Sequence, residues 1–158
     1  MIRIKAVDSQ NLLGVCELTT NQDRTKVECS LCNAISIAET KYNAEMYPNA
    51  IYNNNVLIGF FMYERTEEQA ETAIIRRFMI DDKFQHKGLD KKVFEYILKG
   101  LKIQGVKKVI LMTYNSNESV KALFLSSGFQ ITEKRLIKRN TAIHWSYKPN
   151  LLNTQRSL

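Results

Sequence analysis

Residues 78–91 read FMIDDKFQHKGLDK and join a short apolar run to the longest amphipathic segment of the chain. The apolar run predicts the end of a buried strand, and the apolar spacing after residue 88 predicts a helix. A polar turn that leads into a helix presents backbone N–H groups to an anion, and the helix dipole adds to the attraction. Gly88 lets the backbone approach a ligand closely, and Lys83, Lys87 and Lys91 supply positive charge. A pyrophosphate would fit this turn, although an ordinary strand-to-helix connection with solvated lysines explains the segment equally well.

Hydrophobic periodicity predicts the other elements on both sides of this turn. Towards the N-terminus we expect a strand at 2–7, helices at 12–18 and 27–41, a hairpin of strands 50–52 and 56–64, and a strand at 73–80. Towards the C-terminus we expect a helix at 89–104, a strand at 108–114, a helix at 119–127, and strands at 129–136 and 142–148. The predicted order is β-α-α-β-β-β-α-β-α-β-β in a single domain, residues 1–148, followed by a tail at 149–158.

The composition is that of an ordinary globular protein. Of the 158 residues, 44% are hydrophobic and 25% are charged, so one core can form without disulfide or metal staples. No stretch approaches ~18 consecutive apolar residues, and we therefore expect no membrane span. The N-terminus runs directly into a strand-like pattern without a signal sequence, which predicts a cytoplasmic location.

The cysteines give a weak metal signal. Cys29 and Cys32 have the two-residue gap of a zinc or redox pair, but the sequence contains no second pair, and His86 and His144 are distant. An odd number of cysteines in a chain without an export signal favours reduced thiols. We therefore predict structural thiols and no metal site.

The net charge of +7 is divided unevenly along the chain. Residues 1–72 carry a net charge of −4, and residues 73–158 carry +11. The acidic half suits a cationic ligand and the basic half suits a phosphorylated one, although a merely solvated surface also permits this division. Nucleic-acid binding is a weaker hypothesis, because the lysines are spread over several elements and no recognised nucleic-acid motif accompanies them.

Two motifs resemble those of a known family. Gln85-x-x-Gly88, after an apolar strand, resembles the acetyl-CoA signature of the GNAT superfamily, and residues 77–81 with 85–91 resemble the bacterial spermine/spermidine acetyltransferases. Asn117-x-x-Val120-x-x-Leu123-Phe124-x-x-x-Gly128-Phe129 is similar to the family's later motif. Residues 2–7 and 57–63 also resemble the family, so the likeness covers nearly the whole chain to about residue 148.

This resemblance implies a fold and a set of cofactor contacts. The implied fold class is α/β, an α+β mixed sheet of the GNAT acyl-CoA N-acyltransferase type, which splits between residues 73–80 and 108–114 to admit acetyl-CoA. Backbone groups of the first strand would pair with the pantetheine arm, at Phe78, Met79 and Ile80. The following turn would hold the pyrophosphate, through Gln85, His86, Lys87, Gly88, Leu89, Asp90 and Lys91. Asn117 would line the other side of the cofactor, or serve as a neighbour of a helix N-cap, or do both.

The resemblance also implies the chemistry, a direct attack of a neutral amine on the thioester. A free alkylammonium titrates near ~10.4, so a carboxylate or a carbonyl, usually acting through water, must remove a proton. The candidate carboxylates are Glu28, Glu39, Glu45, Asp81 and Asp82, each of which is also explained as a solvated surface charge. The first three are the expected contacts of a small amine substrate, for which a polyamine is the leading candidate, and the fold is compatible with a homodimer. Further acidic residues could attract a polycation, namely Glu67, Glu68 and Glu71.

Some positions depart from the family pattern. Phe124 stands where the family usually has a tyrosine that protonates the departing thiolate, and Tyr114 is the candidate substitute unless it is simply a core residue. Asp90 and His86 replace small residues of the loop, and a carboxylate at Asp90 would repel a pyrophosphate. Arg76 stands where the polyamine enzymes tend to carry an acid, and it would disfavour a cationic substrate if it faced the cleft. These departures motivate an alternative, a catalytically silent acyl-CoA-binding protein.

Overall fold

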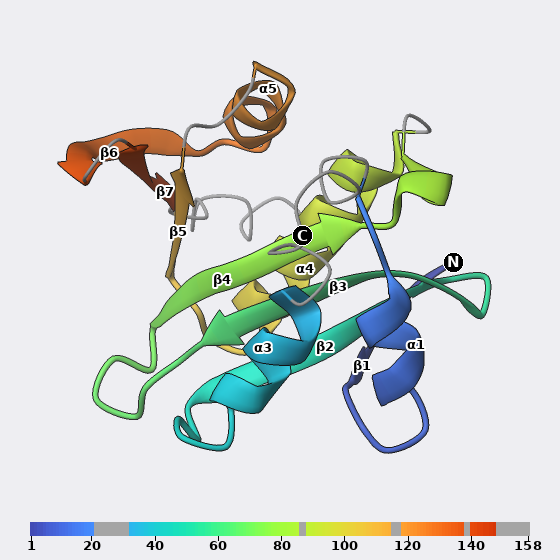
Figure 1. Cartoon of the computed structure of the whole chain (residues 1–158). Helices are drawn as coiled ribbons and strands as arrows, with labels where there is room; N and C mark the ends of the chain where they lie inside the picture. The colour runs from blue at the N-terminus through green and yellow to red at the C-terminus, as the bar shows by residue number, and fades with distance from the viewer. Residues whose placement is uncertain (21–31, 86–87, 115–117, 138–139, 148–158) are drawn as a thin grey trace, which may run out of the picture.

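A single mixed sheet organises the chain in the computed structural model, which describes residues 1–20, 32–85, 88–114, 118–137 and 140–147. Its seven strands lie in the order β1-β2-β3-β4-β5-β7-β6. All neighbours are antiparallel except β4 and β5, which are parallel (Figure 1). The strands are β1 (Ile2–Ala6), β2 (Met46–Asn53), β3 (Val56–Glu64), β4 (Thr72–Ile80), β5 (Lys108–Tyr114), β6 (Gln130–Ile137) and β7 (Asn140–Tyr147).

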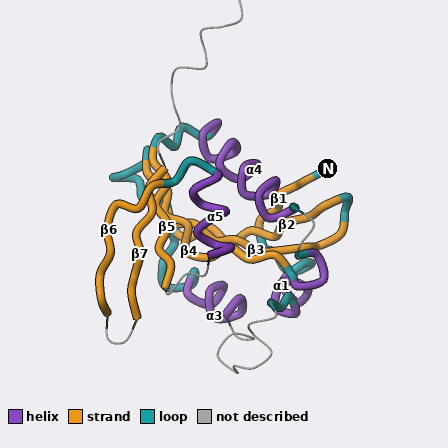
Figure 2. The backbone as a smooth tube through the Cα atoms, turned by 90° about the horizontal axis from the view of Figure 1, so that it is seen from above, coloured by secondary structure: helices purple, strands orange, loops and turns teal. Residues whose placement is uncertain are grey.

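Helices cover both faces of the sheet (Figure 2). On one face lies α4 (Leu89–Ile103), whose apolar stripe enters the main core through Val93, Phe94, Ile97, Leu98 and Leu101. The other face carries α1 (Leu12–Glu17) and α3 (Cys32–Glu39), which enclose a smaller core built on Val15, Phe60 and Met62. The remaining helical elements are a 3-10 turn, η2 (Asp82–Phe84), and α5 (Glu118–Ser126). Among the described residues, no helix is both long enough and apolar enough to cross a bilayer.

The element order confirms the prediction from sequence, with some corrected boundaries. Asn54 and Asn55 adopt positive φ values of 49° and 66°, as expected for asparagines in the turn between β2 and β3. The strand expected to start at residue 50 begins at Met46, because β2 pairs with β3 from Met46↔Glu64 onward. Pro48 lies inside this strand, and its carbonyl accepts a hydrogen bond from the Val7 N–H at 3.0 Å.

The expected helix at 27–41 is described only from residue 32, where α3 runs from Cys32 to Glu39. Residues 27–31 lie outside the described part, as do the expected tail at 149–158 and the last residue of the expected final strand. The turn η2 was not predicted. It follows the side chain of Asp81, which caps it by accepting a hydrogen bond from the Lys83 N–H.

Candidate active site

The sheet splits between its two parallel strands. β4 and β5 pair only from Thr72↔Lys108 to Ile75↔Leu111. Beyond Ile75, β4 continues against β3 alone, while β5 stays paired with β7 as far as Tyr114 (Figure 1). The register between β3 and β4 shifts at the same level, since Met62 faces Arg77 whereas Tyr63 faces Ile75. Arg76 therefore sits in a β-bulge at the point where the strands part.

The alternation of the strand fixes which backbone groups face the split. The Asp81 N–H donates to the Ile58 carbonyl at 2.8 Å, so the peptide groups of Asp81 and Met79 face β3. The peptide groups of Phe78 and Ile80 therefore face the opposite way, into the split. The side chain of Gln85 donates from Nε2 to the Ile80 carbonyl at 3.0 Å, which fastens the following turn to the end of β4.

Asp81 anchors this turn to the segment that follows α1. It is 4% exposed, and its two carboxylate oxygens accept from the Thr19 N–H and the Lys83 N–H, both at 3.0 Å. The adjacent Asp82 N–H donates to the Thr19 carbonyl at 2.8 Å. Through these hydrogen bonds, the Asp81 carboxylate fixes the position of the end of β4.

The start of α4 has the geometry expected of an anion-binding turn. Gly88 is its N-cap, with φ of 68° in the left-handed region, and a Cβ at this position would meet no described atom within 4 Å. No described side chain caps the helix by a hydrogen bond, so its first N–H groups point past Gly88. Lys83 and Lys91 are exposed near it, whereas His86 and Lys87 lie outside the described residues.

Residues 20–129 match the family model described as "Acetyltransferase (GNAT) family". The chain belongs to this family. It is an acetyl-CoA-dependent N-acetyltransferase of the GNAT type, and the split sheet described above is the GNAT fold.

Relatives and solved structures agree with this assignment. The chain is 27% identical over 135 residues to the spermine/spermidine N(1)-acetyltransferase of Bacillus subtilis strain 168, covering 82% of this chain and 88% of the relative. A spermidine N-acetyltransferase chimera from Vibrio cholerae superposes with a TM-score of 0.73 at 14% identity, over 93% of this chain and 94% of the other. An N-acetyltransferase from Thermoplasma acidophilum, solved in complex with coenzyme A, gives 0.63 at 15% identity over 93% and 99%.

The residues of this GNAT chain fit an acyl-CoA, with one mismatch. Acetyl-CoA supplies the activated acyl group, and the turn at Gly88 offers the backbone donors that suit a diphosphate. The mismatch is Asp90, in the first turn of α4, whose Oδ1 is shielded from solvent and has no hydrogen-bond partner in the described part of the chain. A carboxylate favours a helix N-terminus but repels a phosphate placed there.

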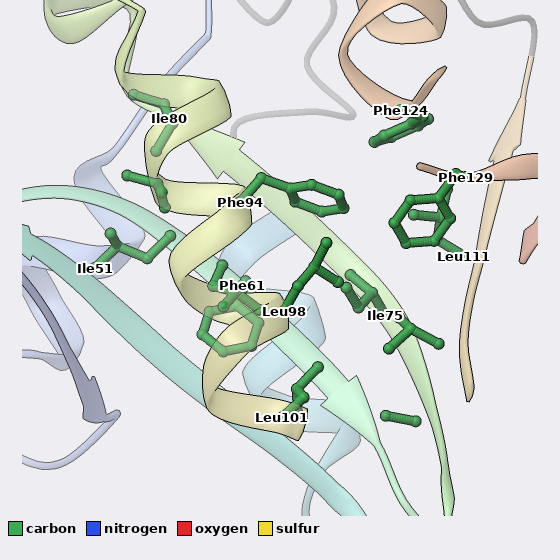
Figure 3. Packing of buried hydrophobic residues seen from close by; sticks show 14 of the residues in the cluster. Ile51, Phe61, Ile75, Ile80, Phe94, Leu98, Leu101, Leu111, Phe124 and Phe129 are labelled. Atoms are coloured by element: carbon green, nitrogen blue, oxygen red, sulfur yellow. The ribbon is translucent and has the colours of Figure 1, made fainter. Parts of the chain in front are cut away.

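Phe124 lies inside the core of this acetyltransferase. It is 6% exposed, and its ring centroid lies 5.6 Å from that of Phe94 and 6.0 Å from that of Phe129 (Figure 3). Phe94 also meets Phe78 edge-on at 5.2 Å, so the aromatic cluster backs onto the strand whose peptide groups face the split. The position expected for the general acid therefore contributes packing. Tyr114 is the last residue of β5, where its backbone pairs with Ala142.

The three glutamates proposed as substrate contacts belong to the N-terminal part, whereas Asp81 and Asp82 follow the end of β4. Glu39 ends α3 and Glu45 precedes β2, and both side chains are exposed. The Glu45 carbonyl accepts from the Arg65 N–H at 3.0 Å, which places it beside the end of β3. Glu28 and Asn117 lie outside the described residues, so their roles stay predictions.

Sequence reasoning missed the acidic partner of Arg76. Arg76 donates from both Nε, at 2.8 Å, and Nη2 to the same oxygen, Oε2 of Glu64. The neighbouring Arg77 donates from Nε to Ser36 Oγ at 3.0 Å, which links β4 to α3. No local signal pointed to Glu64, because twelve residues and a loop separate it from Arg76 and only the strand register brings them together.

A separate hollow of about 260 Å³ lies on the α4 face. It is lined by β1–β3 and α4, among them Tyr63, Tyr96 and Gly100. Burial raises the pKa of the Tyr63 phenol, the neighbouring Tyr47 raises it further, and Arg65 lowers it in part. None of the site residues predicted from the sequence lines this hollow, so the split remains the candidate active site.

Proposed function

We propose that this acetyltransferase acetylates a polyamine, with spermidine and spermine as the first candidates. The support is the similarity to the spermine/spermidine N(1)-acetyltransferase of Bacillus subtilis and the net charge of −4 on residues 1–72. An acidic N-terminal half raises the local concentration of a polycation. The proposal depends on one structural observation, the split after Ile75↔Leu111, which opens next to the turn that suits a diphosphate.

The proposed reaction needs a neutral amine at the split. An alkylammonium with a pKa near ~10.4 first loses a proton to water or a nearby carboxylate. Its nitrogen then forms a bond to the thioester carbonyl carbon and loses a second proton, the C–S bond breaks, and the thiolate leaves and takes up one proton. A thiol of pKa near ~8.5 is a tolerable leaving group without a general acid, so a phenylalanine at position 124 is compatible with turnover.

The test is an acetyl-CoA turnover assay that follows thiol release. Spermidine, spermine, a diamine, a monoamine and an alanine-terminated peptide serve as acceptors at equal concentration. We expect steady thiol release and N-acetylated product with the polyamines, at a kcat/KM at least about tenfold above the monoamine, a difference of ~1.4 kcal/mol in transition-state stabilisation. Turnover of the peptide alone would contradict the polyamine assignment.

A second candidate function follows from Phe124 and Asp90. A protein that lacks a tyrosine hydroxyl at position 124 and carries the Asp90 carboxylate beside the turn at Gly88 would serve as a catalytically silent acyl-CoA-binding module. It predicts thermal stabilisation by coenzyme A without thiol release, by ~2.7 kcal/mol at a ligand concentration of about 100 times Kd. Steady thiol release with any amine rules this function out.

A further inference from the structure

The core restricts the direction from which an amine can reach the split. On the α4 face, the level at which β4 and β5 part is filled by Ile75, Leu98 and Leu111, which are 5%, 6% and 3% exposed (Figure 3). Protein cores are close-packed and admit no ligand without repacking. A nitrogen that attacks an acyl group at this level must therefore approach from the α1 and α3 face.

Glu64 and Arg76 stand on that approach. Tyr63 packs against the main core on the α4 side, so the next residue, Glu64, projects to the opposite face. Arg76 sits in the bulge beside it, one residue past the last β4–β5 pair. The Glu64 side chain is 13% exposed and that of Arg76 is 33% exposed, so the pair is partly withdrawn from water.

The pairing leaves part of the carboxylate unused by Arg76. Both guanidinium contacts go to Oε2 of Glu64, instead of one contact to each oxygen. A two-oxygen fork is the stronger arrangement for an arginine and a carboxylate. Arg77 adds a second guanidinium on the same face, held by Ser36 at 3.0 Å. The cluster formed by Glu64, Arg76 and Arg77 therefore carries a net charge of about +1, which opposes a polycation unless Glu64 is released.

We propose that Glu64 receives a non-reacting ammonium group of the polyamine and that Arg76 competes for the same carboxylate. The ion pair then sets the substrate preference. Each further ammonium group of a substrate must either displace the Arg76 guanidinium from Glu64 or bind close to that guanidinium. This inference rests on the proposed function for its substrate class. It assigns to Glu64 and Arg76 the preference between polyamines and monoamines, and it leaves the binding of coenzyme A unaffected.

The test compares single and double variants of the pair. In Arg76→Gln, the carboxylate is freed, and we expect KM for spermidine to fall about tenfold, while KM for a monoamine changes less than about twofold. In Glu64→Gln, we expect KM for spermidine to rise about tenfold at unchanged affinity for coenzyme A. The double variant Glu64→Gln with Arg76→Gln avoids an uncompensated buried charge, and it should lose the gain of the single Arg76→Gln change.

A matched control is the exposed ion pair of Lys5 and Asp8, whose atoms Nζ and Oδ2 lie 2.9 Å apart on side chains 45% and 39% exposed. Asp8→Asn should leave the ratio of the two KM values unchanged. Equal KM ratios in Arg76→Gln, the double variant and the wild type would overturn the inference.

Calorimetric titration of spermidine into the protein saturated with coenzyme A separates this inference from the proposed function. Tighter binding to Arg76→Gln that is lost in the double variant supports the inference even where the wild type acetylates no amine, a result that would defeat only the proposed function. Absence of spermidine binding to both the wild type and Arg76→Gln would overturn the inference.

Discussion

Phe124 is a packing residue at the position where the family resemblance predicts a tyrosine. Its ring completes an aromatic cluster with Phe94 and Phe129, behind the strand that faces the split. Such ring pairs contribute ~0.5–1.5 kcal/mol beyond their buried area. The position is thus held by packing, and the acceleration that a hydroxyl would give is absent.

Restoring the hydroxyl tests whether the site is otherwise competent. Phe124→Tyr should raise kcat for thiol release by at least about tenfold, because a positioned general acid typically contributes ~10²–10⁴. The buried hydroxyl should also lower the free energy of unfolding by ~1–3 kcal/mol unless it finds a partner. Phe129→Tyr is the matched control, since Phe129 is 2% exposed in the same cluster. An equal kcat in the two variants would contradict the expectation that a hydroxyl at position 124 reaches the departing thiolate.

Asp90 places a carboxylate in the first turn of α4, beside the turn at Gly88. Asp90→Asn removes the negative charge next to the phosphate turn at nearly constant shape. We expect Kd for coenzyme A to fall about three- to tenfold at low salt and by less at high salt, because screening weakens the repulsion. Isothermal titration at two salt concentrations measures this change. Glu95→Gln is the control, one turn further along α4 at an exposed position, and a larger effect there would contradict the argument.

The close approach of β3 and β4 sets the position of the strand end that faces the split. A Cβ at Gly59 would lie 2.5 Å from the Met79 carbonyl oxygen and 2.8 Å from Ile80 Cδ1. The first of these neighbours is backbone and cannot move alone. Any side chain at position 59 would therefore push the end of β4 away from β3, together with the peptide groups of Phe78 and Ile80.

Gly59→Ala should accordingly affect stability and cofactor binding together. We expect a loss of ~1–3 kcal/mol in the free energy of unfolding, measured by urea denaturation, and a weaker affinity for coenzyme A. Gly100→Ala is the control, because Gly100 lies inside α4 with open space around it, and alanine is favoured there by ~0.5–1 kcal/mol. Unchanged stability in Gly59→Ala would show that β3 and β4 can separate without cost.

Local sequence patterns predicted the elements that form the turn at Gly88. The features that they did not predict depend on pairing between residues that are distant in sequence. The stripe of α4 and the glycine at 88 are read directly from the sequence, and both are present in the structure. The start of β2 depends on its pairing with β3, and the Asp81 anchor joins atoms 62 residues apart in sequence. The pair of Glu64 and Arg76 depends on a register shift in the sheet, which no sequence period encodes.

At the scale of the whole molecule, the charge division falls at the start of β4, one strand away from the split. The acidic part, residues 1–72, supplies β1, β2, β3, α1 and α3, whereas the basic part supplies β4 and everything after it apart from Thr72. The parallel pair β4 and β5 therefore opens within the basic part, while the face from which an amine approaches belongs largely to the acidic part. If the acceptor is the proposed polyamine, opposite parts of one molecule attract the phosphorylated co-substrate and the cationic acceptor.

This division predicts a specific salt dependence. The exposed Glu67 and Glu68 lie in the loop before β4, and neither forms an ion pair in the described structure, whereas Glu71 binds Lys107 at 2.6 Å. Raising the ionic strength from about 50 to 300 mM should increase KM for spermidine several-fold, because exposed charges are screened beyond ~10 Å already at 0.1 M. The double variant Glu67→Gln with Glu68→Gln should raise KM at low salt and flatten this dependence, while KM for a monoamine changes little. A salt dependence as steep as that of the wild type would contradict the assignment of the steering charge to Glu67 and Glu68.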